Sequence, residues 1–222
     1  MTLIAIVFTT SISFITSSHS QESKRFIHTV GGKRIEVSVL NAFIQKTMDS
    51  LSMPGLSIGI INNAKLVYHQ TFGLVNIETR QVVTDHTIFE AASLSKPVFA
   101  YFVMKLVEAG KIELDQPFYP FLETIFTPET VDSASLPYYK TLTPRMVLCH
   151  ATGIGNWAGG KPVHIDFKPG TGFSYSGEAY QHLGAAIGTK LGIGWRSKLD
   201  SLFLQEVAHP LGMFNSFFTW ND

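Results

Sequence analysis

Cysteine is almost absent from this chain of 222 residues, which contains only Cys149. A single cysteine excludes an intramolecular disulfide and any metal site built from several cysteines. Because Cys149 ends the apolar run 146–149, we expect a small buried side chain there and not a reactive thiol. An excess of charge is also missing, since 17 basic residues face 17 acidic ones. Binders of nucleic acid or of anionic membranes need a basic excess to displace counterions, so this balance argues against both classes.

Several motifs that would mark other enzyme classes are missing as well. The eight histidines show no His-Glu-x-x-His spacing, so we expect no zinc site. The chain has no phosphate-binding glycine loop and no dinucleotide fingerprint. No segment forms a continuous apolar run of the roughly eighteen residues that a membrane span requires. The sequence therefore indicates no metal, no nucleotide cofactor and no transmembrane helix.

What is present is the balance of a folded protein, with 45% hydrophobic and 15% charged residues. The first twenty residues carry no charged side chain, and Leu3–Ile15 has the length of the apolar region of a signal peptide. Ser18 and Ser20 are small residues at the two positions that a signal peptidase reads, although no Lys or Arg precedes the apolar region. We expect a signal peptide over residues 1–20, a domain over 21–222, and export to a bacterial periplasm or medium.

Hydrophobic periodicity predicts the order of the elements. A polar tether over 21–35 precedes an amphipathic helix over 36–51. Residues 56–61 and 65–72 alternate as two strands of a hairpin, joined by a turn at Asn62-Asn63. A strand-like segment at 88–93 leads into further helices, which the pattern predicts at 93–109, 144–150, 178–191 and 196–208. Thr143 and Gly110 have the chemistry of a helix N-cap and a helix stop, and 153–177 is a glycine-rich loop of the kind that carries sites.

The pattern Ser-x-x-Lys occurs once, at Ser93 and Lys96, where a helix is predicted to begin. Residues three apart lie on one helix face, so the amine of Lys96 can reach the hydroxyl of Ser93. A serine is a poor nucleophile until a base accepts its proton, and a partly desolvated lysine can serve as that base. The helix N-terminus also directs backbone N–H groups toward an anion formed there. The plainer alternative is a capping serine beside a solvated lysine.

Two further residues have chemistry that could assist this pair. Tyr175, in the loop segment Phe173–Gly177, can present its phenol to a serine–lysine pair as a general base or as the acid for a leaving group. The alternative for Tyr175 is a ring that packs at the end of a loop. His150 could be a base or a ligand, but its place at the end of an apolar helix favours a capping or packing role.

In their order along the chain, these pieces resemble the serine β-lactamase and penicillin-binding-protein superfamily, in particular the class C-like branch of D-alanyl-D-alanine carboxypeptidases and esterases. The segments that carry the resemblance are Met53–Ile60, Phe89–Lys96, Leu114–Pro117, Leu142–Gly153, Phe167–Gly170, Phe173–Ser176 and Pro210–Met213. The resemblance implies an α+β fold (α/β in some schemes) of three layers, an antiparallel sheet flanked by helices plus an all-helical subdomain. It also implies acyl transfer through an acyl-enzyme without a cofactor, with Ser93 as nucleophile, Lys96 as its proton partner and Tyr175 as the second acid or base.

The chain departs from the family in two places. The tyrosine motif of the branch's β-lactamases usually ends in Asn, whereas this chain has Gly177 followed by Glu178, which leaves Gly177 a weak substrate-binding candidate. The lost amide shifts our expectation from β-lactams toward esters or peptides. The family's Lys/His-Thr/Ser-Gly strand should follow Pro210–Met213, and Lys190–Gly192 closes a helical segment instead. We expect 21–222 to be an incomplete domain without its C-terminal strands, and weak or absent turnover, since losing one oxyanion donor costs about 10²–10³ in rate.

The predicted function is therefore a serine hydrolase that acts on β-lactams, D-Ala-D-Ala peptides or carboxylic esters, with a small molecule or a peptide as acyl substrate. Two alternatives stay open: a non-catalytic module that binds penicillin or peptidoglycan, and a truncated fragment whose exposed sheet edge pairs with another chain. The presence of Ser93, Lys96 and Tyr175 together favours the hydrolase. The sequence decides neither the substrate nor the oligomeric state.

Overall fold

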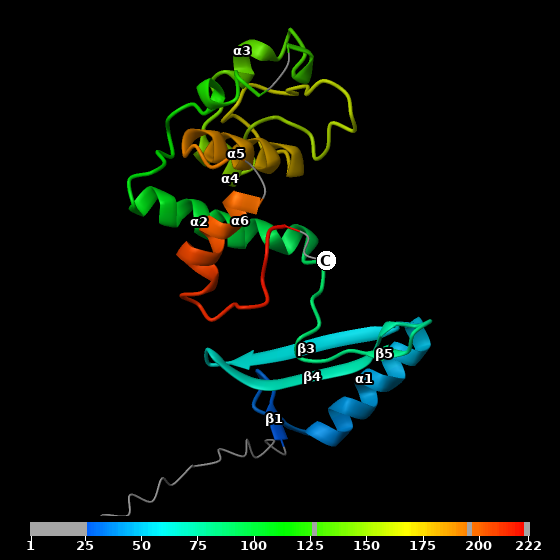
Figure 1. Cartoon of the computed structure of the whole chain (residues 1–222). Helices are drawn as coiled ribbons and strands as arrows, with labels where there is room; N and C mark the ends of the chain where they lie inside the picture. Colours follow the sequence, from blue (N-terminus) through cyan, green and yellow to red (C-terminus); the bar gives the residue numbers. More distant parts are fainter. Residues whose placement is uncertain (1–25, 126–127, 195–196, 220–222) are drawn as a thin grey trace, which may run out of the picture. The chain divides into compact units, whose positions relative to one another are not determined.

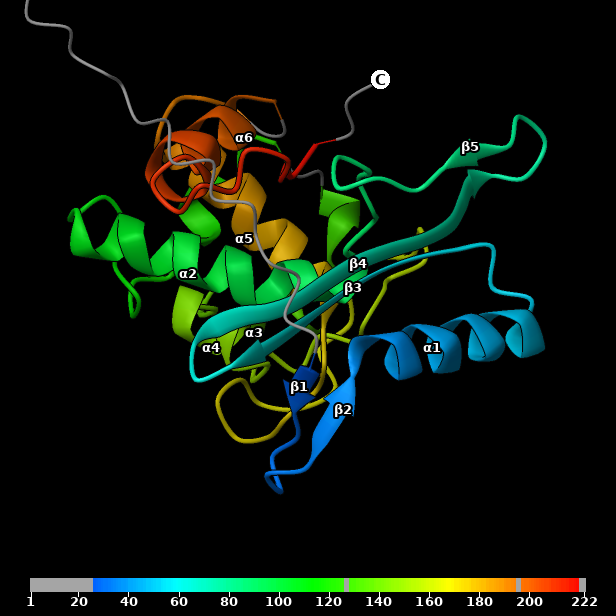
Figure 2. The ribbon, with the colours of Figure 1, turned by 90° about the horizontal axis from the view of Figure 1, so that it is seen from below.

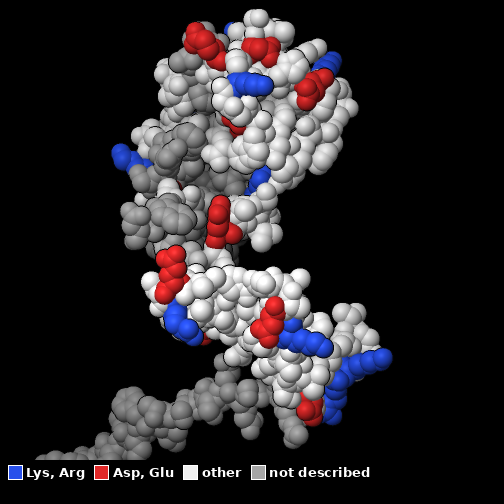
Figure 3. All heavy atoms as spheres, turned by 90° about the vertical axis from the view of Figure 1, so that its right-hand side faces the viewer, with Lys and Arg blue, Asp and Glu red and all other residues white. Residues whose placement is uncertain are grey.

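The structure is a computed structural model that describes residues 26–125, 128–194 and 197–219. The predicted signal peptide over residues 1–20 lies outside these ranges. The chain divides into two compact units, unit 1 over Met1–Thr87 and unit 2 over Ile88–Asp222. On the face shown in Figure 3, each unit carries charges of both signs on a largely uncharged surface. Among the described residues, no helix is both long enough and apolar enough to cross a bilayer.

Unit 1 begins with a small hairpin where the sequence predicted a polar tether. Strands β1 (Phe26–His28) and β2 (Arg34–Glu36) pair antiparallel. The turn between them is closed by Thr29 N–H, which donates to the carbonyl of Lys33 at 2.8 Å, and by Gly32 in a left-handed conformation at φ 77°. The tether prediction was wrong because three-residue strands are too short to show an alternating pattern. The hairpin buries Ile27 in the core of the unit.

The remainder of unit 1 is an antiparallel sheet of order β3-β4-β5 packed against helix α1 (Figure 2). The predicted helix and hairpin are confirmed as α1 (Val37–Leu51), β3 (Gly55–Asn62) and β4 (Lys65–Asn76). The positive φ angles fall one residue later than the predicted turn, at Asn63 and Ala64. The short β5 (Gln81–Val82) adds to β4 within a segment that shows no strand pattern. The buried side chains of this core are Ile27, Ile44, Met48 and Tyr68.

Unit 2 is helical. Its elements are η1 (Ala92–Leu94), α2 (Ser95–Glu108), η2 (Tyr119–Phe121), η3 (Pro128–Thr130), α3 (Leu136–Tyr139), α4 (Pro144–Leu148), α5 (Gly177–Lys190), α6 (Ser197–Phe203) and the π-helical turn η4 (Leu204–Ala208). Helices from distant parts of the sequence lie side by side, as Figure 1 shows for α2 and α5. The core joins α2 residues Phe102, Val103 and Leu106 to Leu183 of α5 and Phe203 of α6. The combination with the unit 1 sheet confirms the α+β class.

Two local predictions in unit 2 need correction. The strand-like segment at 88–93 forms no strand, and the chain passes through irregular structure into η1. Cys149 is exposed, not buried. Helix α4 buries Pro144 and Val147, while Arg145 and Cys149, four residues apart, share its outer face, where Arg145 forms two hydrogen bonds with Asp115. The apolar neighbours of Cys149 in the sequence did not indicate which face of this short helix would be covered.

Candidate active site

Ser93 is exposed within η1, at the entrance to α2, and follows a residue in an unusual conformation. Ala92 has a φ of 45°, in the left-handed region that costs a residue with a Cβ roughly 1–2 kcal/mol. Leu94 N–H donates to the carbonyl of Ala91 at 2.9 Å, which closes the turn that carries Ser93. Backbone strain of this kind is concentrated at functional sites in proteins. The exposed hydroxyl is therefore held at the start of α2, which buries one face in the core, by a tight turn.

Lys96 lies between the Ser93 hydroxyl and two tyrosine rings. Its Nζ donates a hydrogen bond to Ser93 Oγ at 3.2 Å, the contact predicted from the three-residue spacing. The same Nζ lies 4.8 Å from the ring centroid of Tyr175 and 5.8 Å from that of Tyr180. Tyr180 belongs to α5, and its hydroxyl donates to the carbonyl of Leu148 at 3.3 Å. The amine is thus enclosed by groups from α2, α5 and the loop before α5.

Tyr175 directly precedes the N-cap of α5, so its position is set by the start of that helix. Ser176 caps the helix, since its Oγ accepts from Ala179 N–H at 3.0 Å and donates to the carbonyl of Gly155 at 2.9 Å. Hydrogen bonds with Lys96 and then with Ser93 lower the pKa of the Tyr175 phenol, the Lys96 charge acts in the same direction, and partial burial opposes it. The phenol therefore gives up its proton more readily than a solvated tyrosine does.

The three candidate residues are thus brought together within unit 2. Ser93 and Lys96 come from one turn of chain, and Tyr175 joins them from a distant loop. The sequence favoured a capping or packing role for His150 but did not predict its partner: the His150 ring centroid lies 4.5 Å from that of Tyr175 at an interplanar angle of 31°. Nothing in the spacing of His150 and Tyr175 along the chain signals this contact. The arrangement offers a hydroxyl, an amine and an acidified phenol within reach of one reacting atom.

Gly177, the weak substrate-binding candidate, is buried beside this cluster. Its N–H donates to the carbonyl of Asn156 at 3.1 Å and to the side-chain oxygen of Asn156 at 2.9 Å, so this donor is already satisfied. A Cβ at position 177 would lie 2.7 Å from the ring of Trp157, closer than real Cβ contacts. The indole therefore occupies the space that a side chain at 177 would need. A role for Gly177 in substrate binding stays a prediction.

Glu178, the charged neighbour of Gly177, is turned into the protein. Its Oε2 accepts from the backbone N–H of Ala158 at 3.0 Å. Its Oε1 lies 3.3 Å from Nε2 of His182, and Nδ1 of His182 is 2.8 Å from the hydroxyl of the buried Tyr139. The charge at 178 thus belongs to a buried network that links α5 to α3. It does not point toward Ser93.

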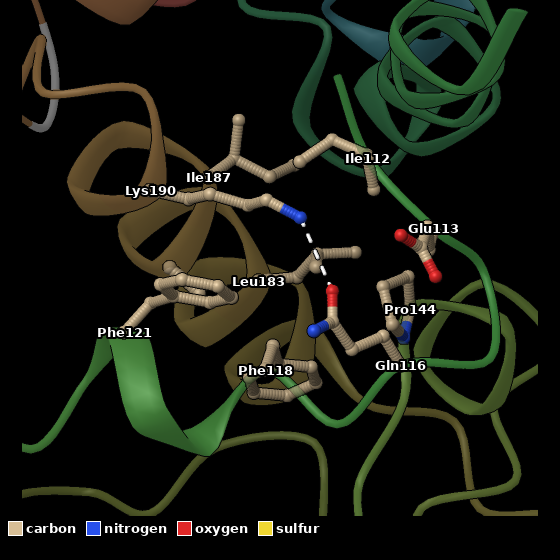
Figure 4. Close-up of a pocket in the computed structure, with 10 residues that line it drawn as sticks. Ile112, Glu113, Gln116, Phe118, Phe121, Pro144, Leu183, Ile187 and Lys190 are labelled. Atoms are coloured by element: carbon tan, nitrogen blue, oxygen red, sulfur yellow. Dashed lines mark hydrogen bonds between the residues drawn. The ribbon is translucent and has the colours of Figure 1, made fainter. Parts of the chain in front are cut away.

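Lys190, which begins the sequence Lys-Leu-Gly, closes α5 as the sequence predicted and forms no strand. Figure 4 shows its side chain crossing a small apolar hollow to Gln116, with an Nζ to Oε1 distance of 3.2 Å. The Nζ also lies 5.1 Å from the ring centroid of Phe121. Ser93, Lys96 and Tyr175 do not line this hollow. Within the described ranges, no group of three His, Cys, Asp or Glu residues could hold a metal ion.

Comparison with known proteins identifies the family to which the chain belongs. The profile of the family described as Beta-lactamase matches residues 40–222. The chain is 26% identical over 203 residues to esterase EstB of Burkholderia gladioli, covering 78% of this chain and 49% of the esterase. It is 26% identical over 187 residues to a beta-lactamase of Pseudomonas fluorescens, covering 81% and 50%.

A solved structure shares the fold at the same level of identity. The octameric penicillin-binding protein homologue from Pyrococcus abyssi superposes with a TM-score of 0.64 at 26% identity, covering 81% of this chain and 44% of that one. The chain therefore spans about half the length of the two relatives, and somewhat less of the archaeal structure.

Proposed function

Because this chain belongs to the beta-lactamase family, whose profile matches residues 40–222, we propose that it carries the acylation site of a serine hydrolase. Ser93 is the nucleophile, Lys96 its proton partner and Tyr175 the second acid or base. The observation that carries the proposal is the hydrogen bond of 3.2 Å from Lys96 to Ser93, with the ring of Tyr175 beside the same amine at 4.8 Å from Nζ to its centroid. Such a nucleophile–base contact is the signature of covalent catalysis.

The proposed reaction with an ester uses these three side chains and one water molecule. Ser93 Oγ attacks the carbonyl carbon while its proton passes to the Tyr175 phenolate, directly or through the Lys96 amine. The bond from carbon to the alcohol oxygen then breaks, and Tyr175 returns the proton to the departing alcohol. Water attacks the acyl-enzyme, releases the carboxylic acid and restores the Ser93 hydroxyl. No metal or organic cofactor takes part.

Carboxylic esters are the proposed substrate class, ahead of β-lactams and D-Ala-D-Ala peptides. The amide that recognises an acylamido side chain in the resembling enzymes is replaced by Gly177, and Trp157 fills the adjacent space with an apolar ring that is 62% exposed. An exposed indole suits an apolar acyl or alkyl group better than a peptide amide. One relative of this chain is an esterase, which agrees with that preference. That carboxylic esters are the substrate of the whole protein is part of this proposal.

The experiment is acetylation by p-nitrophenyl acetate, followed by release of p-nitrophenol and by intact and peptide mass spectrometry. The acetyl group is expected on the peptide that carries Ser93, and the Ser93→Ala variant should lose it. Ser95→Ala is the matched control, because Ser95 lies in the same turn and should leave acetylation unchanged. An adduct that persists in Ser93→Ala, or that moves to Ser95, would refute the assignment of the nucleophile.

Export is a separate part of the proposal and rests on the apolar segment Leu3–Ile15. Cleavage after Ser20 would leave Gln21 as the first residue of the mature chain. N-terminal sequencing of the protein recovered from the periplasm or the medium of an expressing bacterium tests this. A protein that stays in the cytoplasm with its first residues intact would contradict it.

A further inference from the structure

His150 is hydrogen-bonded to both chain neighbours of Tyr175. Its carbonyl oxygen accepts from the backbone N–H of Ser174 at 2.8 Å, and its ring Nδ1 accepts from the backbone N–H of Ser176 at 3.1 Å. Between these two bonds, the imidazole lies against the phenol ring at a centroid distance of 4.5 Å. The residue therefore holds the peptide groups on either side of Tyr175 and supports the ring itself.

We propose that His150, neutral and protonated on Nε2, is the positioning residue that holds the Tyr175 phenol against Ser93 and Lys96. This inference rests on the proposed function and adds to it a residue that touches no substrate. An Nδ1 that accepts a hydrogen bond must have its lone pair free, which assigns the ring proton to Nε2. A proton added at Nδ1 would face the N–H of Ser176, so the bond would be lost.

The backbone of His150 explains how one residue makes both bonds. Its φ is 57°, in the left-handed region that residues other than glycine seldom adopt. Its own N–H donates to the carbonyl of Val147 at 3.0 Å, so His150 stays bonded to the last turn of α4. The next part of the loop holds the same segment, since Ser174 Oγ donates to the carbonyl of Ile154 at 3.2 Å. The chain from His150 onward thus forms a cradle for the residues around Tyr175.

The groups that face His150 keep it neutral. Lys96 of α2, Tyr175 of the loop and Tyr180 of α5 surround the ring, and Phe173 meets it edge-on with centroids 5.7 Å apart. None of these groups supplies a negative charge at neutral pH except Tyr175 when it is ionised. Burial first, and the positive charge of Lys96 second, lower the pKa of His150 below its usual value of 6.5. The acceptor at Nδ1 therefore survives into mildly acidic solution.

Two substitutions separate the hydrogen bond from the ring. In His150→Asn the side-chain oxygen can occupy the place of Nδ1, Asn tolerates a positive φ, and the group does not take up a proton. In His150→Phe the ring stays and the acceptor is lost. We expect the Asn variant to retain most of the acylation rate and to lose the part of the acidic decline that follows from protonation of His150, while the part that follows from protonation of Tyr175 stays. The Phe variant should lose about 10²-fold in kcat with little change in KM, because the reacting phenol is misplaced while binding is not altered.

A readout that does not depend on turnover keeps this test separate from that of the proposed function. NMR of tyrosine labelled with ¹³C at Cζ, assigned with Tyr175→Phe, reports the pKa of the Tyr175 phenol. We expect that pKa to stay low in the Asn variant and to rise toward 10 in the Phe variant, since the phenol then leaves Lys96. In the unmodified protein, the same signal should show a second inflection at the pKa of His150. This measurement does not depend on whether a variant folds.

The possible outcomes are distinct. An unchanged kcat and an unchanged Tyr175 pKa in the Phe variant, or a Tyr175 signal in the unmodified protein that ignores the titration of His150, would overturn the inference. If instead the Tyr175 signal behaves as expected but the chain never acylates Ser93, the positioning role stands and the proposed hydrolase activity fails. Thermal unfolding of each variant confirms that the comparison is made between folded proteins.

Discussion

Replacing Lys96 by methionine removes the amine and keeps the length and apolar stem of the side chain. In the structure this amine forms the 3.2 Å bond to Ser93 Oγ, at the limit of the roughly 2.6–3.2 Å reach of a general base. It is also the leading cause of the lowered pKa of Tyr175. A single substitution therefore withdraws the proton partner of the nucleophile and weakens the second acid or base. Because a positioned acid or base contributes about 10²–10⁴-fold in rate, Lys96→Met should slow acylation of Ser93 by that factor.

The assay is the pre-steady-state release of p-nitrophenol, compared over a range of pH. Loss of Lys96 should also raise the Tyr175 pKa toward 10, so the residual activity should appear only at more alkaline pH. Lys105→Met is the matched control, since Lys105 lies on the same helix and pairs with the exposed carboxylate of Glu108. It should change the acylation rate little, because exposed pairs contribute less than about 1 kcal/mol. A Lys96→Met protein that acylates at the unmodified rate and pH would refute the reasoning.

Three further predictions concern the surroundings of the site. Gly177→Asn should lower the free energy of unfolding by about 1–3 kcal/mol through overpacking against Trp157, and Trp157→Ala should remove most of that loss in urea titrations of the double variant. Tyr139→Phe should cost about 1–3 kcal/mol, because it removes the hydroxyl partner of buried His182; an unchanged denaturation midpoint would contradict this. Burial lowers the pKa of both His150 and His182, so the unfolded chain takes up protons near pH 6.5 that the folded chain refuses. The melting temperature should therefore fall as the pH drops below about 6.5, a trend that a flat profile would exclude, and His150→Asn should reduce the slope.

Local chemistry accounts for the elements that were predicted correctly. Helix α1 follows from apolar residues at helical spacing, and α4 begins where Thr143 accepts from Met146 N–H at 3.3 Å. Helix α2 ends before Gly110, which adopts a φ of 66°. Each of these signals acts within one or two turns of chain, so a single sequence contains it in full.

The errors arose where pairing or packing with a distant segment decided the outcome. The strands β1 and β5 are too short to show a pattern, and they form because a partner strand satisfies their backbone groups. Cys149 is exposed because α4 turns its other face to the core. In each case the residues nearby in sequence were compatible with more than one environment, and the neighbours in space selected one.

The candidate site likewise combines one contact that is local in the sequence with others that join distant segments. The contact between Lys96 and Ser93 depends only on helical geometry over three residues, and the sequence alone determined it. The approach of Tyr175 and the two hydrogen bonds that His150 accepts from Ser174 and Ser176 depend on how α2, α4 and the start of α5 pack together. Those helices pack together because doing so removes their apolar faces from water. This driving force is not directional, so the spacing of residues along the chain does not indicate which ones it brings together.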